Sequence, residues 1–91
     1  MKYKVQYCSA YHEVLLEEIK EYDGSAEEML CSACEKVINR YQRMSQRLRE
    51  KIPYVTVHQY RYEINGNEAK VIDPDDTEEF NIREIIVVQP I

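Results

Sequence analysis

Glycine, proline, cysteine and tryptophan are all scarce in this chain: two, three, three and none in 91 residues. So few glycines and prolines exclude long flexible linkers and a glycine-rich phosphate loop. Three cysteines, without a signal-peptide pattern, argue against a disulfide framework and for a reducing cytoplasm. The longest apolar run is four residues, Ile85 to Val88, which is too short for a membrane span. We therefore expect a single cytoplasmic domain, residues 1–91.

Charge is unevenly distributed along an acidic chain. The net charge of −5 argues against non-specific coating of nucleic acid, which needs basic residues facing the phosphates. Twelve of the 17 acidic residues lie within residues 13–28 and 73–79, whereas six of the 12 basic residues lie between Lys36 and Lys51. A local basic surface is therefore expected, suited to self-association, to a polar protein partner or to phosphate.

The beginning of the chain predicts a strand followed by a helix. Residues 2–8 alternate between polar and apolar side chains, so Tyr3, Val5 and Tyr7 are expected to face the core. Ser9 is a suitable N-cap for a helix over residues 10–22. The apolar face of that helix holds Tyr11, Leu15, Ile19 and Tyr22.

A longer helix is predicted after Asp23-Gly24. Ser25 and Glu28 form a capping box, and Pro53 ends the helix about 26 residues later, or about 39 Å at helical rise. Its apolar stripe, in alternating steps of four and three, is Leu30, Cys34, Val37, Tyr41, Met44 and Leu48.

The last third of the chain predicts three strands. Residues 54–64 and 68–72 form a hairpin, in which a Gly66-Asn67 loop is preferred because it places Glu63 opposite Lys70. The alternative loop, Asn65-Gly66, is the commoner turn signal and places Glu63 opposite Glu68. Asp73-Pro74 predicts one or two helical turns or an acidic loop, and residues 82–91 predict a central strand. The fold class is therefore α+β, in the order β-α-α-β-β-β, with a long helix along a mainly antiparallel sheet of three or four strands.

The cysteines could form one of two kinds of site, a redox pair or a zinc site. Cys31 and Cys34 have the spacing of a redox pair, but Cys31 lies inside the helix, where nearby glutamates disfavour a thiolate. A zinc site could combine Cys8, His12, Cys31 and Cys34. The alternative is that Cys34 is a small buried apolar residue within the stripe.

A basic row follows one flank of the long helix. Lys36, Arg40, Arg43 and Arg47 are spaced by four, three and four residues, which places them on one side of the helix beside the apolar stripe. Such a row could contact an acidic protein surface or phosphates. The alternatives are a solvated flank or ion pairs with Glu17 and Glu21 of the predicted first helix.

Tyrosine is abundant, with eight residues against one phenylalanine. Tyr54, Tyr60 and Tyr62 share a predicted strand face with Thr56 and His58. If Val55 and Val57 face the helix, the tyrosine face is partly open and could anchor a protein partner or stack bases. The alternative is that these tyrosines are core residues with their hydroxyls at the rim.

These patterns favour a non-enzymatic interaction module, of regulator or inhibitor type, with no cofactor and no membrane partner. It would bind a protein and self-associate as a dimer through Tyr54, His58, Tyr60 and Tyr62 and the basic flank. A second hypothesis is nucleic-acid action, because the predicted element order resembles the RelE/ParE-type toxins; no catalytic residue matches. The zinc-binding domain is the third.

Overall fold

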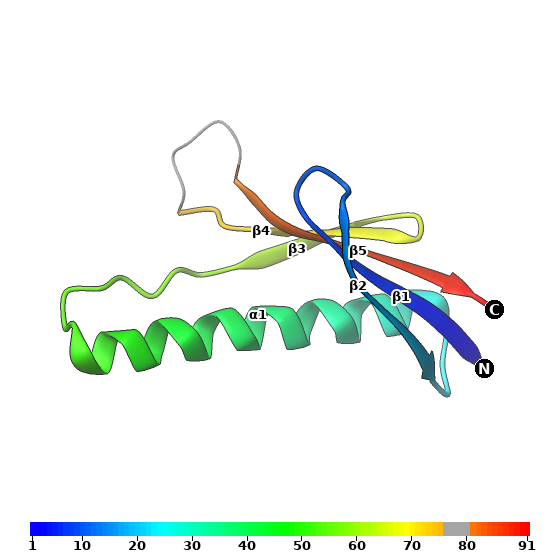
Figure 1. Ribbon diagram of the computed structural model, residues 1–91, viewed down its shortest axis with the longest axis horizontal. Helices are drawn as coiled ribbons and strands as arrows, with labels where there is room; N and C mark the ends of the chain where they lie inside the picture. Colours follow the sequence, from blue (N-terminus) through cyan, green and yellow to red (C-terminus); the bar gives the residue numbers. More distant parts are fainter. Residues whose placement is uncertain (76–80) are drawn as a thin grey trace.

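The computed structural model describes residues 1–75 and 81–91. Over these residues a five-stranded sheet is covered on one face by one long helix (Figure 1). The elements are β1 (Lys2–Cys8), β2 (Val14–Glu21), α1 (Ala26–Lys51), β3 (Arg61–Asn65), β4 (Glu68–Ile72) and β5 (Ile82–Pro90). The strand order is β2-β1-β5-β4-β3, and every neighbouring pair is antiparallel. The predicted α+β class is confirmed.

The core lies between the helix and the three inner strands. Tyr3 and Val5 of β1, Val71 of β4 and Ile86 of β5 point toward the helix and are buried. Leu30 is the largest helix residue among the fully buried side chains. β5 is flanked by β1 and β4, so its prediction as a central strand is confirmed.

The long helix begins and ends as predicted. The Ser25 side chain accepts a hydrogen bond of 3.1 Å from the Glu28 backbone N–H, which satisfies a free donor of the first turn. The helix ends at Lys51, two residues before Pro53. Its second half projects beyond the strands (Figure 1), and Met44 and Leu48 of the apolar stripe are exposed there.

The predicted helix over residues 10–22 is wrong: residues 14–21 form β2, the hairpin partner of β1. Neither face of β2 is well covered, so its sequence lacks the clean polar–apolar alternation of a half-buried strand. The apolar spacing therefore predicted a helix instead. Ser9 does not cap a helix. Its hydroxyl accepts from the backbone N–H groups of Tyr11 and Glu13, at 3.2 Å each, and so shapes the hairpin loop.

The hairpin near residue 66 has the predicted register. Glu63 lies opposite Lys70, and Asn65 lies opposite Glu68, so Gly66-Asn67 is the loop; Gly66 has a φ of 66°, a conformation that glycine adopts without strain. The predicted strand over residues 54–64 is too long. β3 begins only at Arg61 because its partner β4 spans five residues.

The element order is therefore β-β-α-β-β-β, and the sheet has five strands rather than three or four. The resemblance to RelE/ParE-type toxins depended on two helices after the first strand, and the second strand removes that basis. The predicted helical turns or acidic loop after Asp73-Pro74 fall mainly on residues 76–80, which lie outside the described residues. Within the described part of the chain, no helix has the length and apolar character needed to cross a membrane.

Candidate functional site

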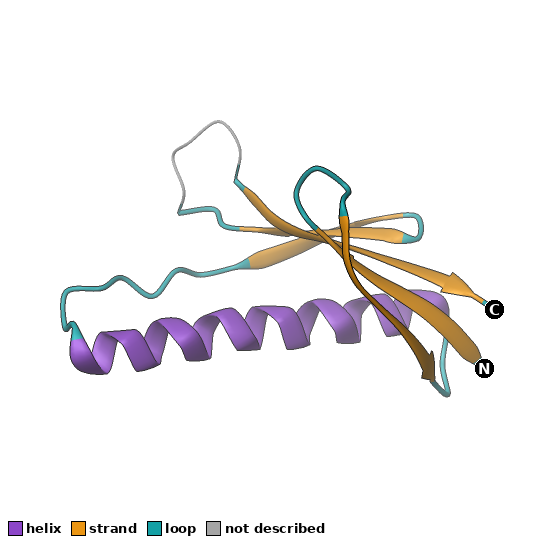
Figure 2. Cartoon of the chain, viewed as in Figure 1, coloured by secondary structure: helices purple, strands orange, loops and turns teal. Residues whose placement is uncertain are grey.

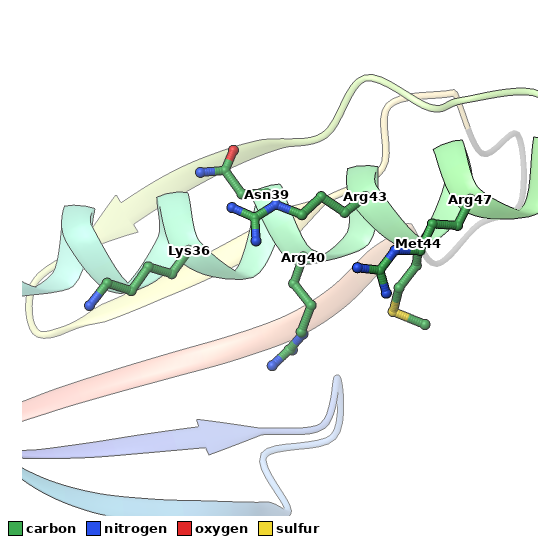
Figure 3. Close-up of a pocket in the computed structure, with 6 residues that line it drawn as sticks. All are labelled: Lys36, Asn39, Arg40, Arg43, Met44 and Arg47. Atoms are coloured by element: carbon green, nitrogen blue, oxygen red, sulfur yellow. The ribbon is translucent and has the colours of Figure 1, made fainter.

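The basic row predicted from sequence lies along one exposed flank of α1. Figure 3 shows the side chains of Lys36, Arg40, Arg43 and Arg47 spread along this flank, and all four residues are exposed. We call these four residues the basic flank. With Asn39 and Met44 they line a shallow hollow of about 310 Å³.

A second hollow, of about 550 Å³, adjoins the first between α1 and β2. Lys36 and Arg40 line both hollows. The wall opposite the helix is formed by β2, including Leu16 and Glu18. Lys36 and Arg40 of the basic flank therefore face β2 across a hollow whose lining combines charges of both signs with apolar surface.

Arg40 is held in place by a buried carboxylate. Glu84 of β5 is only 7% exposed and accepts hydrogen bonds from Arg40 Nη2 at 3.2 Å and from the Tyr41 hydroxyl at 2.7 Å. Burial, together with the hydrogen bond to Glu84, raises the pKa of Tyr41 to about 12, so the phenol stays protonated and keeps donating. The Arg40 guanidinium also lies 5.5 Å from the centre of the Tyr41 ring.

The other members of the basic flank have no such partner. Among residues 1–75 and 81–91, the ion pairs do not include Lys36, Arg43 or Arg47. The expected alternative pairs with Glu17 and Glu21 do not form among the described residues, because both acids lie on the face of β2 that points away from the helix, opposite Gln6 and Lys2 of β1. As far as residues 1–75 and 81–91 are concerned, these three cations are available to an external acidic group.

A second polar cluster surrounds Asp73, at the end of β4. Asp73 is 1% exposed. Its Oδ2 lies 2.5 Å from His58 Nδ1 and 3.5 Å from Arg83 Nη2, and its Oδ1 accepts from the Asp75 backbone N–H at 3.1 Å. Asp75 in turn accepts from the Gln59 backbone N–H at 2.9 Å. The cluster ties the segment before β3 to the end of β4.

Within the described ranges, one group of potential metal ligands is compact: atoms of His58, Asp73 and Asp75 lie within 4.8 Å of one another. The guanidinium of Arg83 already brings a positive charge to the Asp73 carboxylate. His58 is hydrogen-bonded to that carboxylate as well. This arrangement is a satisfied structural cluster around a buried acid.

Protonation of His58 should stabilise the fold. The hydrogen bond to Asp73 is the main cause that raises the pKa of His58 above its ordinary 6.5. This stabilisation is therefore complete below pH 6.5 and is lost as the pH rises through the raised pKa. We expect His58→Gln to lower the melting temperature most at acidic pH, with the difference shrinking toward alkaline pH. Thermal unfolding between about pH 5 and pH 9 measures this, and a difference independent of pH would contradict it.

The four predicted zinc ligands do not form a compact group among the described residues. Cys8 and Cys34 are buried, and Cys31 is half-buried. Burial raises the pKa of Cys34 to about 12, which keeps its thiol protonated and favours its role as a core residue. His12 lies in the β1–β2 loop, where its Nε2 is 2.7 Å from Glu68 Oε1.

Of the two alternatives for the tyrosines, Tyr60 and Tyr62 follow the one in which they are core residues, and they do not form an open face with Tyr54. Tyr60 and Tyr62 are half-buried and pack against the core under the helix, and Tyr60 stacks on Tyr41 with ring centres 5.3 Å apart. Tyr54 is 88% exposed but belongs to the loop between α1 and β3. The four residues predicted as one surface are therefore divided: Tyr60 and Tyr62 belong to the core, Tyr54 to a loop and His58 to the polar cluster.

Sequence reasoning missed Glu84, Asp73 and Arg83 as organising residues. The available signals were weak: Glu84 is an acid within an apolar strand, and Asp73 precedes a proline and suggested an N-cap. Comparisons with protein-family models, curated proteins and solved structures find no match to this chain.

Proposed function

We propose that this chain is a small non-enzymatic protein-interaction module, of regulator or inhibitor type, that binds an acidic segment of a protein partner through the basic flank. The observation that carries the proposal is the row of exposed cations along α1, three of which have no ion pair among the described residues. A binding site of this kind needs no bound cofactor.

A protein partner fits this surface better than nucleic acid. The hollow beside the flank includes the exposed apolar side chain of Met44, and Leu48 continues the apolar surface one turn further. Apolar groups between cations suit a segment that alternates acidic and apolar residues. The net charge of −5 also opposes the long-range attraction that draws a polyanion to a protein.

Charge reversal on the basic flank tests the proposal. We expect Arg47→Glu to weaken capture of the cellular partner by about tenfold or more, since like charges then face each other at the interface. The measurement is quantitative affinity capture followed by mass spectrometry, with the tagged wild-type chain and the variant compared in parallel.

Arg49→Glu is the matched control. It makes the same change of charge two residues further along α1, but on the opposite side of the helix from Arg47 at 100° per residue. Partner capture should be retained in Arg49→Glu. Equal loss in both variants, or no loss in Arg47→Glu, would contradict recognition by the basic flank. Recovery of nucleic acid instead of protein would favour a nucleic-acid-acting domain.

A further inference from the structure

β2 is an edge strand that exposes an unusual amount of apolar surface. It pairs with β1 on one side, and its other edge lies at the end of the sheet (Figure 2). Leu15 is 68% exposed, Leu16 is 51% exposed and Ile19 is 59% exposed. A long edge strand with apolar side chains invites pairing with another strand. The opposite edge, β3, is shorter and has no large apolar side chain of comparable exposure.

We propose that the free edge of β2 pairs with β2 of a second copy of this chain, joining two sheets into one across a two-fold axis. The proposal goes beyond the binding of an acidic partner by the basic flank. Dimerisation does not need that partner, so either proposal can fail without the other.

Symmetry restricts the possible registers. Two adjacent antiparallel strands are related by an axis perpendicular to the sheet, and this operation keeps each face of the sheet on its own side. A residue is therefore opposite a residue that lies on the same face. Neighbouring residues of β2 lie on opposite faces. The two-fold axis must therefore pass between a residue of one copy and the same residue of the second copy, so that this residue is paired with itself.

Of the axes beside residues 16–19, the one beside Ile19 is the one that places opposite charges across the new ladder. In this register Glu18 lies opposite Lys20 of the second copy, and the symmetry produces this pair twice. An axis beside Glu18 or Glu17 places that glutamate opposite the same glutamate of the second copy. An axis beside Leu16 gives no pair of opposite charges. Opposite charges directly across a ladder are favoured, and like charges are disfavoured.

The surroundings of Glu18 agree with this register. Its Oε2 is buried and accepts no hydrogen bond from the described residues, although Lys20 Nζ of the same strand lies 3.3 Å away as a charge contact. A second Lys20, from the other copy, would supply the missing donor. The same register places Glu17 opposite Glu21, but each has a lysine of β1 to offset the repulsion. Lys4 Nζ lies 3.9 Å from Glu17, and Lys2 is the cross-strand partner of Glu21.

Ile19→Glu tests the edge with little risk to the fold. Ile19 lies opposite Lys4 of β1 in the same chain, so a glutamate there has a favourable neighbour in the monomer. In the proposed dimer the new glutamate lies opposite the same glutamate of the second copy, so two negative charges repel each other. We expect the wild-type chain to dimerise in analytical ultracentrifugation and Ile19→Glu to raise the dissociation constant by roughly tenfold or more. Tyr54→Glu, which changes an exposed side chain of a distant loop, is the control and should dimerise normally.

A charge-swap experiment tests the register itself. Glu18→Lys and Lys20→Glu each place like charges opposite one another, so each variant alone should be monomeric. Mixed in equal amounts, with one variant uniformly labelled with ¹⁵N, they restore both opposite-charge pairs, and native mass spectrometry should detect the heterodimer by its intermediate mass. A monomeric wild-type chain, an Ile19→Glu variant that dimerises like the wild type, or a mixture that stays monomeric would overturn the proposal.

Discussion

Leu30→Ala is expected to lower the free energy of unfolding by about 3 kcal/mol. Leu30 is 1% exposed and lies in the cluster between α1 and the sheet. Removing its branched end forfeits apolar burial and leaves a cavity that the packed strands cannot fill completely. Because domains of this kind are stable by only about 5–15 kcal/mol, the loss is a large share of the total.

Chemical denaturation with urea measures the change, and Leu48→Ala is its matched control. Both substitutions are made in the same helix, but Leu48 is 47% exposed on the part that projects beyond the sheet. We expect Leu48→Ala to change the free energy of unfolding by less than about 0.5 kcal/mol. Equal effects of the two substitutions would mean that the helix is not packed on the sheet as described.

Asp73→Ala is the second substitution with a large expected effect, a loss of about 2–4 kcal/mol. The buried carboxylate joins His58, Arg83 and the Asp75 backbone N–H. Its removal takes away the common acceptor of three polar groups and leaves a cavity at a side chain that is 1% exposed. The unfolding midpoint should fall, and the pH dependence attributed to His58 should disappear with it.

Asp75→Ala is the comparison for Asp73→Ala. It removes an exposed carboxylate that accepts a hydrogen bond from the Gln59 backbone N–H, and it leaves the Asp73 contacts in place. We expect its cost to be about 1 kcal/mol. If Asp73→Ala costs no more than Asp75→Ala, the cluster does not organise the chain around Asp73.

The elements with strong local signals were predictable. β1 alternates cleanly because one face is buried, α1 has a cap, an apolar stripe and a terminal proline, and the cross-strand charges Glu63 and Lys70 selected the hairpin register. β2 was not predictable, because its structure depends on pairing with β1 rather than on its own pattern. The sequence 14–21 is compatible with a helix until a partner strand is available, which is a tertiary effect that local pattern does not contain.

The basic flank was predictable for the same reason as α1: helical spacing determines which residues share a side. The anchoring of Arg40 was not, because its partner Glu84 is 44 residues further along the chain. The position of His58 depends on Asp73, 15 residues away in another element. The tyrosine face was misassigned because alternation identifies which residues share a face of a strand, but does not say which face the helix covers.

Fluorescence anisotropy with two labelled probes distinguishes protein recognition by the basic flank from nucleic-acid binding most directly. One probe is a peptide that alternates glutamate and leucine, and the other is a single-stranded oligonucleotide of equal negative charge. We expect the wild-type chain to bind the peptide more tightly, to retain part of that binding as salt rises because apolar contacts are not screened, and to lose it in Arg47→Glu. Tighter binding of the oligonucleotide, lost steeply as salt rises, would contradict the proposed function.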